Sequence, residues 1–465
     1  MAVEWSKLPP EVLVRLDRTR RGTLGAQLQD ELRAAIRAGR LEVGERLPST
    51  RVLARELGVS RGLAQECYEQ LVAEGYLIAR SGAGTRVAER AARPTARPTA
   101  PPCRPAVSVD FRAGVPDLAS FPTRDWLWAL GDAARRAPLD ALGYGDPAGR
   151  PELRAVLAAY LRRVRGADTH PNSIVVCSGF TQGLGLVLAT LRAAHHTRVG
   201  IEDPGHPDWA CIARDAGLRA AAIPVDPDGA RVEQSPTDVR AAILTPAHQT
   251  PTGVALAAGR RRAAITWAAE RDGWLIEDDY DAEFRYDRQP VGLLQGLAPD
   301  RVISIGSVSK PLGPALRLGW IVCPPELRDA IARHKRLADY GSPGLDQLAL
   351  GRLIESGRYD RHLRRMRARY GRKRQALLAA LADHAPNVEI TGLAAGFHAV
   401  LRLPATVDEN AVARAAAERA VRVDPMSRYR LTAHDHPPQL VLGFGNLTEA
   451  AIRRGIATIA DLLAP

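Results

Sequence analysis

The chain has 465 residues, of which 46% are apolar and 25% charged, and its formal net charge is +12. The length predicts two or three domains, and the composition is that of a globular protein rather than a disordered or fibrous one. The N-terminus lacks the apolar core of a signal peptide, and no run approaches the roughly 20 apolar residues of a membrane helix. The five cysteines have no CxxC spacing. We therefore expect a cytoplasmic protein without membrane association or a metal site.

Residues 10–88 predict a small helical domain that ends in a β-hairpin. The segment TLGAQLQDELRAAIRAG predicts an amphipathic helix, because Leu or Ile recurs every four residues. A second helix, STRVLAREL, is followed after a three-residue turn by a third, SRGLAQECYEQLVAEG, with Ser60 as its N-cap. YLIARSGAGTRVA then predicts two short strands around a glycine turn. Two helices joined by so short a turn are typical of a helix-turn-helix, whose second helix enters the DNA major groove.

The polar residues of this domain are placed for contact with DNA. Arg61 and Gln65 lie on the expected exposed side of the third helix, Arg51 opens the second helix, and Ser81 and Gly82 form the hairpin tip. The segment from GERLPSTRVLAREL to GAGTRVA resembles the winged helix-turn-helix of GntR-type transcriptional regulators. This resemblance implies that Arg51, Ser60, Arg61, Gln65 and Gly82 contact double-stranded operator DNA. The alternative is a helical interaction domain with solvated arginines.

Residues 89–107 are rich in Pro, Ala, Arg and Thr and have no apolar period, so they predict a linker. The following domain, residues 108–465, alternates helical stretches with short apolar runs: SIVVCSG, RVGIED, AAILTP, WLIEDD and RVISIGS. This alternation predicts βα units around a largely parallel sheet. Ligands of such sheets bind at the carboxyl ends of the strands.

Polar residues follow three of these apolar runs. After SIVVC, the backbone amides of Gly179, Phe180 and Thr181 can open a helix onto a phosphate. After WLIE, an aspartate at 278 or 279 offers a carboxylate to a pyridinium nitrogen, and Tyr280 offers a phenol. After RVISIG come Ser307, Ser309, Lys310 and, seven residues on, Arg317. Taken singly, these are also common turn glycines, capping acids and surface cations.

Lys310 stands out because the chain has only four lysines, and every other basic residue is arginine. Arginine cannot lose its proton in a protein or act as an amine nucleophile, whereas lysine can form a Schiff base. Lysine, hydroxyls and an arginine close together predict a site for a phosphorylated aldehyde. The alternative is a surface lysine that escaped the bias toward arginine.

The order of these segments resembles a fold-type I pyridoxal-phosphate (PLP) enzyme of the aspartate aminotransferase superfamily. Further matches are VDFRAGVPDLASFP, YGDPAGRPELR, EDPGHP, TPAHQTPTG, EDDYDAEFRY and GFHAVLRLP. A GntR-like head joined by a linker to an aminotransferase-like body resembles the MocR subfamily of regulators. We therefore expect a winged helix-turn-helix plus an α/β fold-type I body that binds cofactor and dimerises.

The resemblance also implies roles for individual residues. Lys310 is expected to form the Schiff base with pyridoxal 5'-phosphate, Asp278 rather than Asp279 to pair with the pyridine nitrogen, and Tyr280 to bond the ring hydroxyl. Further expected cofactor-binding residues are Ser307, Ser309, Arg317 and the 179–181 amides at the phosphate, His206 at the ring, and Tyr144, which reaches the phosphate of a partner subunit in a homodimer.

Two positions depart from the aminotransferase pattern. His206 stands where the family commonly has a tyrosine stacked on the ring, and Val441 stands where an arginine holds the substrate carboxylate. The second change disfavours transamination but not cofactor binding. We expect a PLP-binding transcriptional regulator rather than an enzyme, with PLP itself or an amine or amino acid as effector, controlling vitamin B6 or amino-acid metabolism. The alternatives are an active aminotransferase with an accessory DNA-binding head, and a dimerisation scaffold with a vestigial site.

Overall fold

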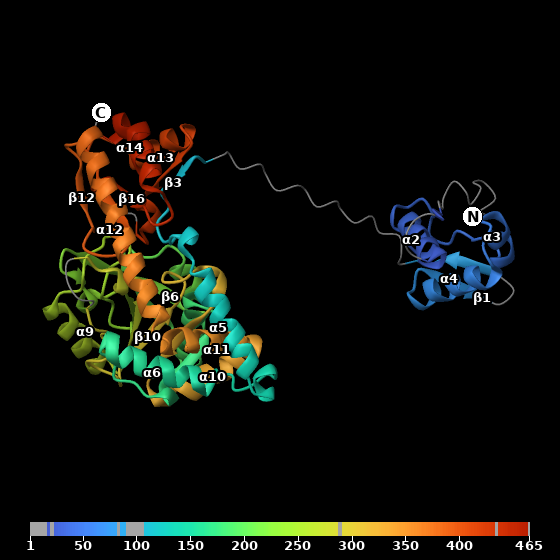
Figure 1. Ribbon diagram of the computed structural model, residues 1–465, viewed down its shortest axis with the longest axis horizontal. Coiled ribbons are helices and arrows are strands. Elements are labelled where there is room, and N and C mark those ends of the chain that lie inside the picture. The colour runs from blue at the N-terminus through green and yellow to red at the C-terminus, as the bar shows by residue number, and fades with distance from the viewer. Residues whose placement is uncertain are drawn as a thin grey trace. The chain divides into compact units, whose positions relative to one another are not determined.

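The computed structural model describes residues 16–18, 23–80, 84–89, 107–286, 291–432 and 436–463. The chain divides into two compact units, Met1–Arg104 and Pro105–Pro465, which we call the head and the body (Figure 1). Ser81, Gly82 and nearly all of the predicted linker lie outside the described residues. No helix in the described ranges is long and apolar enough to cross a membrane.

The head has the predicted helices and hairpin: α2 (Leu24–Arg37), α3 (Thr50–Glu56), α4 (Arg61–Ala73), β1 (Leu77–Arg80) and β2 (Gly84–Val87). Each helix begins after a hydroxyl N-cap, and the predicted cap Ser60 accepts a hydrogen bond from the amide of Leu63 at 3.2 Å. Leu28 and Leu32 of α2 pack with Leu71 of α4 in one core. The strands pair antiparallel, as a hairpin requires.

The body contains an eight-stranded sheet in the order β4-β11-β10-β9-β8-β5-β6-β7, and only β11 and β7 run antiparallel to their neighbours. The bounds are β4 Ile174–Cys177, β5 Arg198–Asp203, β6 Arg219–Asp226, β7 Gly229–Ala230, β8 Ala241–Leu244, β9 Trp274–Asp279, β10 Val302–Ser307 and β11 Gly319–Val322. The five predicted apolar runs are therefore β4, β5, β8, β9 and β10, and the prediction of a largely parallel sheet is confirmed.

Helices cover both faces of this sheet, which is why its strands are apolar on both sides. Residues of α7 (Phe180–Ala193), α8 (Trp209–Asp215) and α10 (Pro325–Asp339) share a core with Ile243 and Ile276. The alternate residues Leu244 and Leu275 pack with α9 (Ala258–Glu270) on the other face. That face also carries α6 (Pro151–Arg165) and α11 (Gly344–Glu355), and α11 contacts both α6 and α5 (Thr123–Arg136).

A second, smaller sheet lies in the C-terminal part of the body, in the order β12-β13-β16-β15. Its strands are β12 Glu389–Thr391, β13 His398–Arg402, β15 Asp424–Pro425 and β16 Gln439–Gly443; β14 (Val421–Arg422) pairs separately with β3 (Val109–Asp110). The 27-residue helix α12 (Arg358–His384) runs from the large sheet to this part, where it packs on α14 (Glu449–Leu463), beside α13 (Glu409–Glu418) (Figure 1).

Candidate cofactor site

A cavity of about 370 Å³ opens at the carboxyl ends of β9 and β10 and the start of α7. This is the edge of an open α/β sheet at which ligands bind. Nine of the residues predicted for the cofactor line it: Phe180, Thr181, His206, Asp278, Tyr280, Ser307, Ser309, Lys310 and Arg317. Gly179 directly precedes Phe180 at the start of α7. The small sheet supplies a further wall through Phe397 and His398, at the start of β13. The sequence-predicted site is thus brought together from five separate segments.

Lys310 lies just beyond β10, and its Nζ donates a hydrogen bond to the carbonyl oxygen of Gly114 at 2.6 Å. Burial lowers the pKa of this ammonium below its usual value, and the negative charge of Asp278 opposes the shift. A lowered pKa increases the neutral fraction of the amine, which is the form that attacks a carbonyl carbon.

The two aspartates at the end of β9 have different surroundings. Asp279 accepts hydrogen bonds from Arg165 Nε at 3.0 Å and Nη2 at 2.7 Å, and the two side chains are 7% and 0% exposed. Asp278 instead lines the cavity, and burial raises the pKa of its carboxyl well above the usual value, with Lys310 opposing the rise. Because neighbouring residues of a strand face opposite ways, only Asp278 is available to a ligand.

The opposite end of the cavity has the donors expected for a phosphate. Gly179 is the N-cap of α7 at φ +88°, and the first amides of that 14-residue helix point out of its N-terminus. The Arg317 guanidinium donates to the carbonyl oxygen of Ser178, and a Cβ on Gly179 would lie 3.1 Å from it. Ser307 and Ser309 line the same cavity. Helix amides, hydroxyls and a guanidinium form a donor set that fits a dianionic phosphate.

Tyr280 belongs to a buried hydrogen-bonded cluster that the sequence did not single out. His248 Nδ1 lies 2.9 Å from Asp281 Oδ2 and 3.0 Å from the Tyr280 hydroxyl oxygen, and the ring of His398 lies beside that of His248, tilted by 38°. Burial, with the neighbouring His248, lowers the pKa of His398 to about 3, so its ring is neutral near pH 7. The ligand atoms of His248, Asp281 and His398 lie within 4.8 Å of one another, close enough for a metal, although hydrogen bonds already engage them.

His206 lines the cavity and stacks on Trp209, with ring centroids 5.9 Å apart and an angle of 20° between the planes. Burial lowers the pKa of His206, which favours the neutral imidazole. A neutral ring held flat by Trp209 is able to stack on a cofactor as the commoner tyrosine would. The place of His206 at a cofactor ring stays a prediction.

Val441 is fully buried in the small sheet, packed with Val400, Met426 and Tyr429, and does not line the cavity. Two arginines that the sequence reasoning missed do line it. Arg112 is paired with Asp110 at 2.7 Å and Arg428 with Asp424 at 2.9 Å. The cavity therefore keeps guanidinium groups despite the valine at 441, and each has a carboxylate partner.

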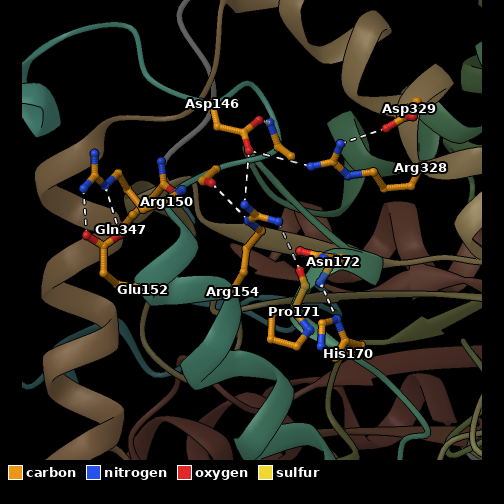
Figure 2. A network of polar contacts seen from close by, with 12 residues as sticks. Asp146, Arg150, Glu152, Arg154, His170, Pro171, Asn172, Arg328, Asp329 and Gln347 are labelled. Atoms are coloured by element: carbon orange, nitrogen blue, oxygen red, sulfur yellow. Dashed lines mark hydrogen bonds and ion pairs between the residues drawn. The ribbon is translucent and has the colours of Figure 1, made fainter.

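Tyr144 lies outside this cavity, with 83% of its surface exposed. Two hydrogen bonds anchor the loop that follows it, residues 145–150 (Figure 2). Arg154 donates to Asp146 at 3.1 Å, and Gln347 accepts from the Arg150 amide at 2.7 Å. Arg328 also faces Asp146, at 3.6 Å. The reach of Tyr144 into a partner subunit stays a prediction.

In the head, the predicted DNA-contacting residues within the described ranges are all exposed: Arg51, Ser60, Arg61 and Gln65. Arg61 is the first residue of α4, and Gln65 lies one turn later, where it donates to Glu69 at 3.0 Å. The two side chains thus project from one end of the recognition helix of a helix-turn-helix.

Comparison with known proteins divides the chain at the same place. Residues 24–87 match the bacterial regulatory proteins of the gntR family, and residues 108–459 match the class I and II aminotransferases. The chain is 32% identical to the HTH-type pyridoxine biosynthesis transcriptional regulator PdxR of Corynebacterium glutamicum over 94% of its own length and 96% of that protein. It is 33% identical to a probable rhizopine catabolism regulatory protein, MocR of Rhizobium meliloti, over 96% and 94%. The structure of an archaeal alanine:glyoxylate aminotransferase superposes with a TM-score of 0.69 and 27% identity. The superposition covers 76% of this chain and 90% of the aminotransferase chain.

Proposed function

The chain belongs to the MocR-type regulators, in which a GntR DNA-binding domain is joined to a class I and II aminotransferase domain, and on this premise we propose that it is a transcriptional regulator that senses PLP or an amine through Lys310. In this proposal residues 10–88 bind operator DNA, residues 89–107 link the domains, and residues 108–465 bind the cofactor and dimerise. The matched aminotransferase family is PLP-dependent.

The observation that carries the proposal is the single cavity that holds Lys310, Asp278 and the phosphate-binding end together. PLP, when bound, would supply an electrophilic carbonyl carbon that forms a covalent bond with a neutral amine. Lys310 Nζ would be that amine. Asp278 would keep the pyridine nitrogen protonated, Tyr280 would donate to the ring oxygen, and Arg317 with Ser307, Ser309 and the α7 amides would hold the phosphate.

We further propose that the body works as a homodimer. Large apolar side chains are exposed together around Tyr144: Leu139 is 88% exposed, Leu142 69% and Tyr340 57%. Leu142, Tyr144 and Tyr340 line one shallow depression. Exposed apolar side chains clustered in this way are typical of an interface. A second copy covering this surface would bring Tyr144 to the partner's site.

The effector class follows from what the cavity retains. One relative is named a regulator of pyridoxine biosynthesis, which supports PLP as effector and control of vitamin B6 synthesis. Arg112 and Arg428 support a second candidate, an amine or amino acid with a carboxylate, because guanidinium groups bind carboxylates in a bidentate manner. Val441 in place of the usual arginine leaves the body a sensor rather than an active aminotransferase.

The test is the visible absorption spectrum of the full chain titrated with PLP, for wild type, Lys310→Ala and Lys310→Arg. The arginine variant keeps the charge but cannot form the covalent bond. We expect a visible band in wild type that is lost on borohydride reduction and is missing in both variants. DNA binding by Arg61→Ala, compared with wild type with and without PLP, tests the regulatory half, and we expect it to be lost. Multiple turnovers with an amino donor and a keto acid would instead identify an active aminotransferase.

A further inference from the structure

The positive charge of the body is concentrated in one helix. Residues 108–465 contain 46 Lys and Arg against 40 Asp and Glu, a surplus of six. Helix α12 alone contains nine of these cations and two of the acids, a surplus of seven. The rest of the body therefore has 37 cations and 38 acids and is essentially neutral. A surplus confined to 27 residues creates a local positive potential rather than a diffuse one.

Part of α12 borders an open groove of about 850 Å³ beside α14. Four arginines line it, Arg364, Arg367 and Arg372 from α12 and Arg453 from α14, against one acid, Glu449. Between them the groove is lined by small residues, including Ala368 and Gly371, and a Cβ built on Gly371 would meet no atom within 4 Å. The groove is thus lined by an excess of positive charge and has free space beside Gly371.

These arginines are not neutralised within the part of the chain that the structure describes. Arg364 and Arg453 are exposed and make no side-chain hydrogen bond or ion pair there. Arg367 donates to a backbone carbonyl, that of Glu283, at 2.7 Å and 2.9 Å, which leaves its charge uncompensated. Arg372 faces Glu449 at 3.5 Å in an exposed pair, which contributes little. Several other α12 cations, such as Lys373 with Asp117 and Arg358 with Asp125, have close partners outside the groove.

We propose that this groove binds the phosphate backbone of duplex DNA that flanks the site held by the head, an inference that rests on the proposed DNA-binding function. The groove is open and has arginines along its length, which suits an extended polyanion better than a small enclosed ligand. Arg364 and Arg372 are eight residues apart, about 12 Å along the helix axis, which is comparable to the width of the DNA major groove. Because head and body are one chain, DNA bound by the head stays at high local concentration near the groove.

The experiment measures binding of the full chain to a mixed-sequence duplex of about 40 base pairs, roughly four helical turns. Fluorescence anisotropy is recorded between about 50 mM and 200 mM salt. The groove variant is Arg364→Ala/Arg372→Ala/Arg453→Ala. The matched control, Arg214→Ala/Arg402→Ala/Arg414→Ala, removes the same charge from exposed positions elsewhere on the body. Thermal unfolding and PLP binding of both variants establish that they fold.

Each lost phosphate contact lowers the slope of log K against log salt by about 0.9, so we expect the groove variant to lose up to about 2.7 in slope and at least about tenfold in affinity at the lowest salt. The control is expected to match wild type. Equal slopes for the groove variant and the control would overturn the proposal. The proposal would also be overturned if the groove variant bound DNA like wild type but no longer bound an acidic poly-glutamate peptide, because the partner of the groove would then be a protein.

A third variant separates this inference from the proposed function. Arg61→Ala/Gln65→Ala alters only the head. If it binds DNA like wild type, the proposed role of the head fails, whereas the comparison of groove variant and control still decides the groove.

Discussion

The two adjacent aspartates of β9 are expected to respond oppositely when each is changed to asparagine. Asp279→Asn removes one partner of a buried, bidentate ion pair and leaves the Arg165 guanidinium without its main counter-charge. Burial opposes the charge of Arg165, but Asp279 and Glu283 outweigh it and hold the pKa of the guanidinium above its usual value. Breaking such a pair costs about 3–5 kcal/mol, because the remaining charge is left buried.

Asp278→Asn has the reverse profile. The Asp278 carboxylate has no ion-pair partner among the described residues, and its burial already disfavours the charged form, so the amide is expected to leave the stability of the apoprotein nearly unchanged. It would lose the charge-assisted bond to the pyridine nitrogen, worth about 1.5–3 kcal/mol, which corresponds to about 10- to 150-fold in PLP affinity.

Urea denaturation of the apoprotein and PLP titration of the folded protein measure the two effects separately. With a slope of about 1–3 kcal/mol per molar urea, we expect Asp279→Asn to lower the midpoint of the body's transition by at least about 1 M. The assignment would be refuted if Asp278→Asn destabilised the body as strongly as Asp279→Asn, or if Asp279→Asn weakened PLP binding more than Asp278→Asn did under conditions where both are folded.

Three further changes have defined outcomes. Gly179→Ala places a side chain beside Arg317 in a backbone conformation that favours glycine. We therefore expect about 1–3 kcal/mol of destabilisation in thermal unfolding, together with weaker PLP binding. Unchanged PLP affinity would contradict the phosphate assignment. Because burial lowers the pKa of Lys310, the fraction of neutral amine rises with pH through a midpoint below the ordinary 10.5, and the rate of covalent PLP attachment should follow it; a midpoint at or above that value would contradict the burial argument. Ser60→Ala removes the cap bond to the Leu63 amide and should cost the head about 1 kcal/mol, which Ser60→Asp should largely restore.

Much of the fold could be predicted because local patterns and tertiary packing agree. The strands of the large sheet are short apolar runs bounded by polar residues, and the head helices begin at hydroxyl caps. Lys310 could be predicted to be chemically distinct because lysine is so rare in this chain. These signals depend on neighbours in sequence, so one sequence is enough to detect them.

The parts that were missed depend on contacts between distant segments. His248 and Asp281 follow two different strands of the large sheet, and His398 begins a strand of the small sheet, so their contacts appear only in the folded chain. Arg112 and Arg428 likewise resemble many other arginines until the fold places them in the cavity. The choice of Asp278 over Asp279 rested on the family resemblance alone, because the physical distinction is the buried partner Arg165, more than a hundred positions away.

The short segment from Tyr280 to Tyr286 joins the cavity to the outer groove. Tyr280 forms a wall of the cavity, the Glu283 carbonyl accepts from Arg367, and Tyr286 lines the groove. A ligand that shifts Tyr280 therefore acts on a stretch of chain only six residues from the rim of the groove. If the cofactor alters the affinity of the groove for DNA by some factor, DNA must alter the affinity of the cavity for the cofactor by the same factor, because binding equilibria at two linked sites are reciprocal. A promoter bound in this way would itself set the concentration at which the regulator responds.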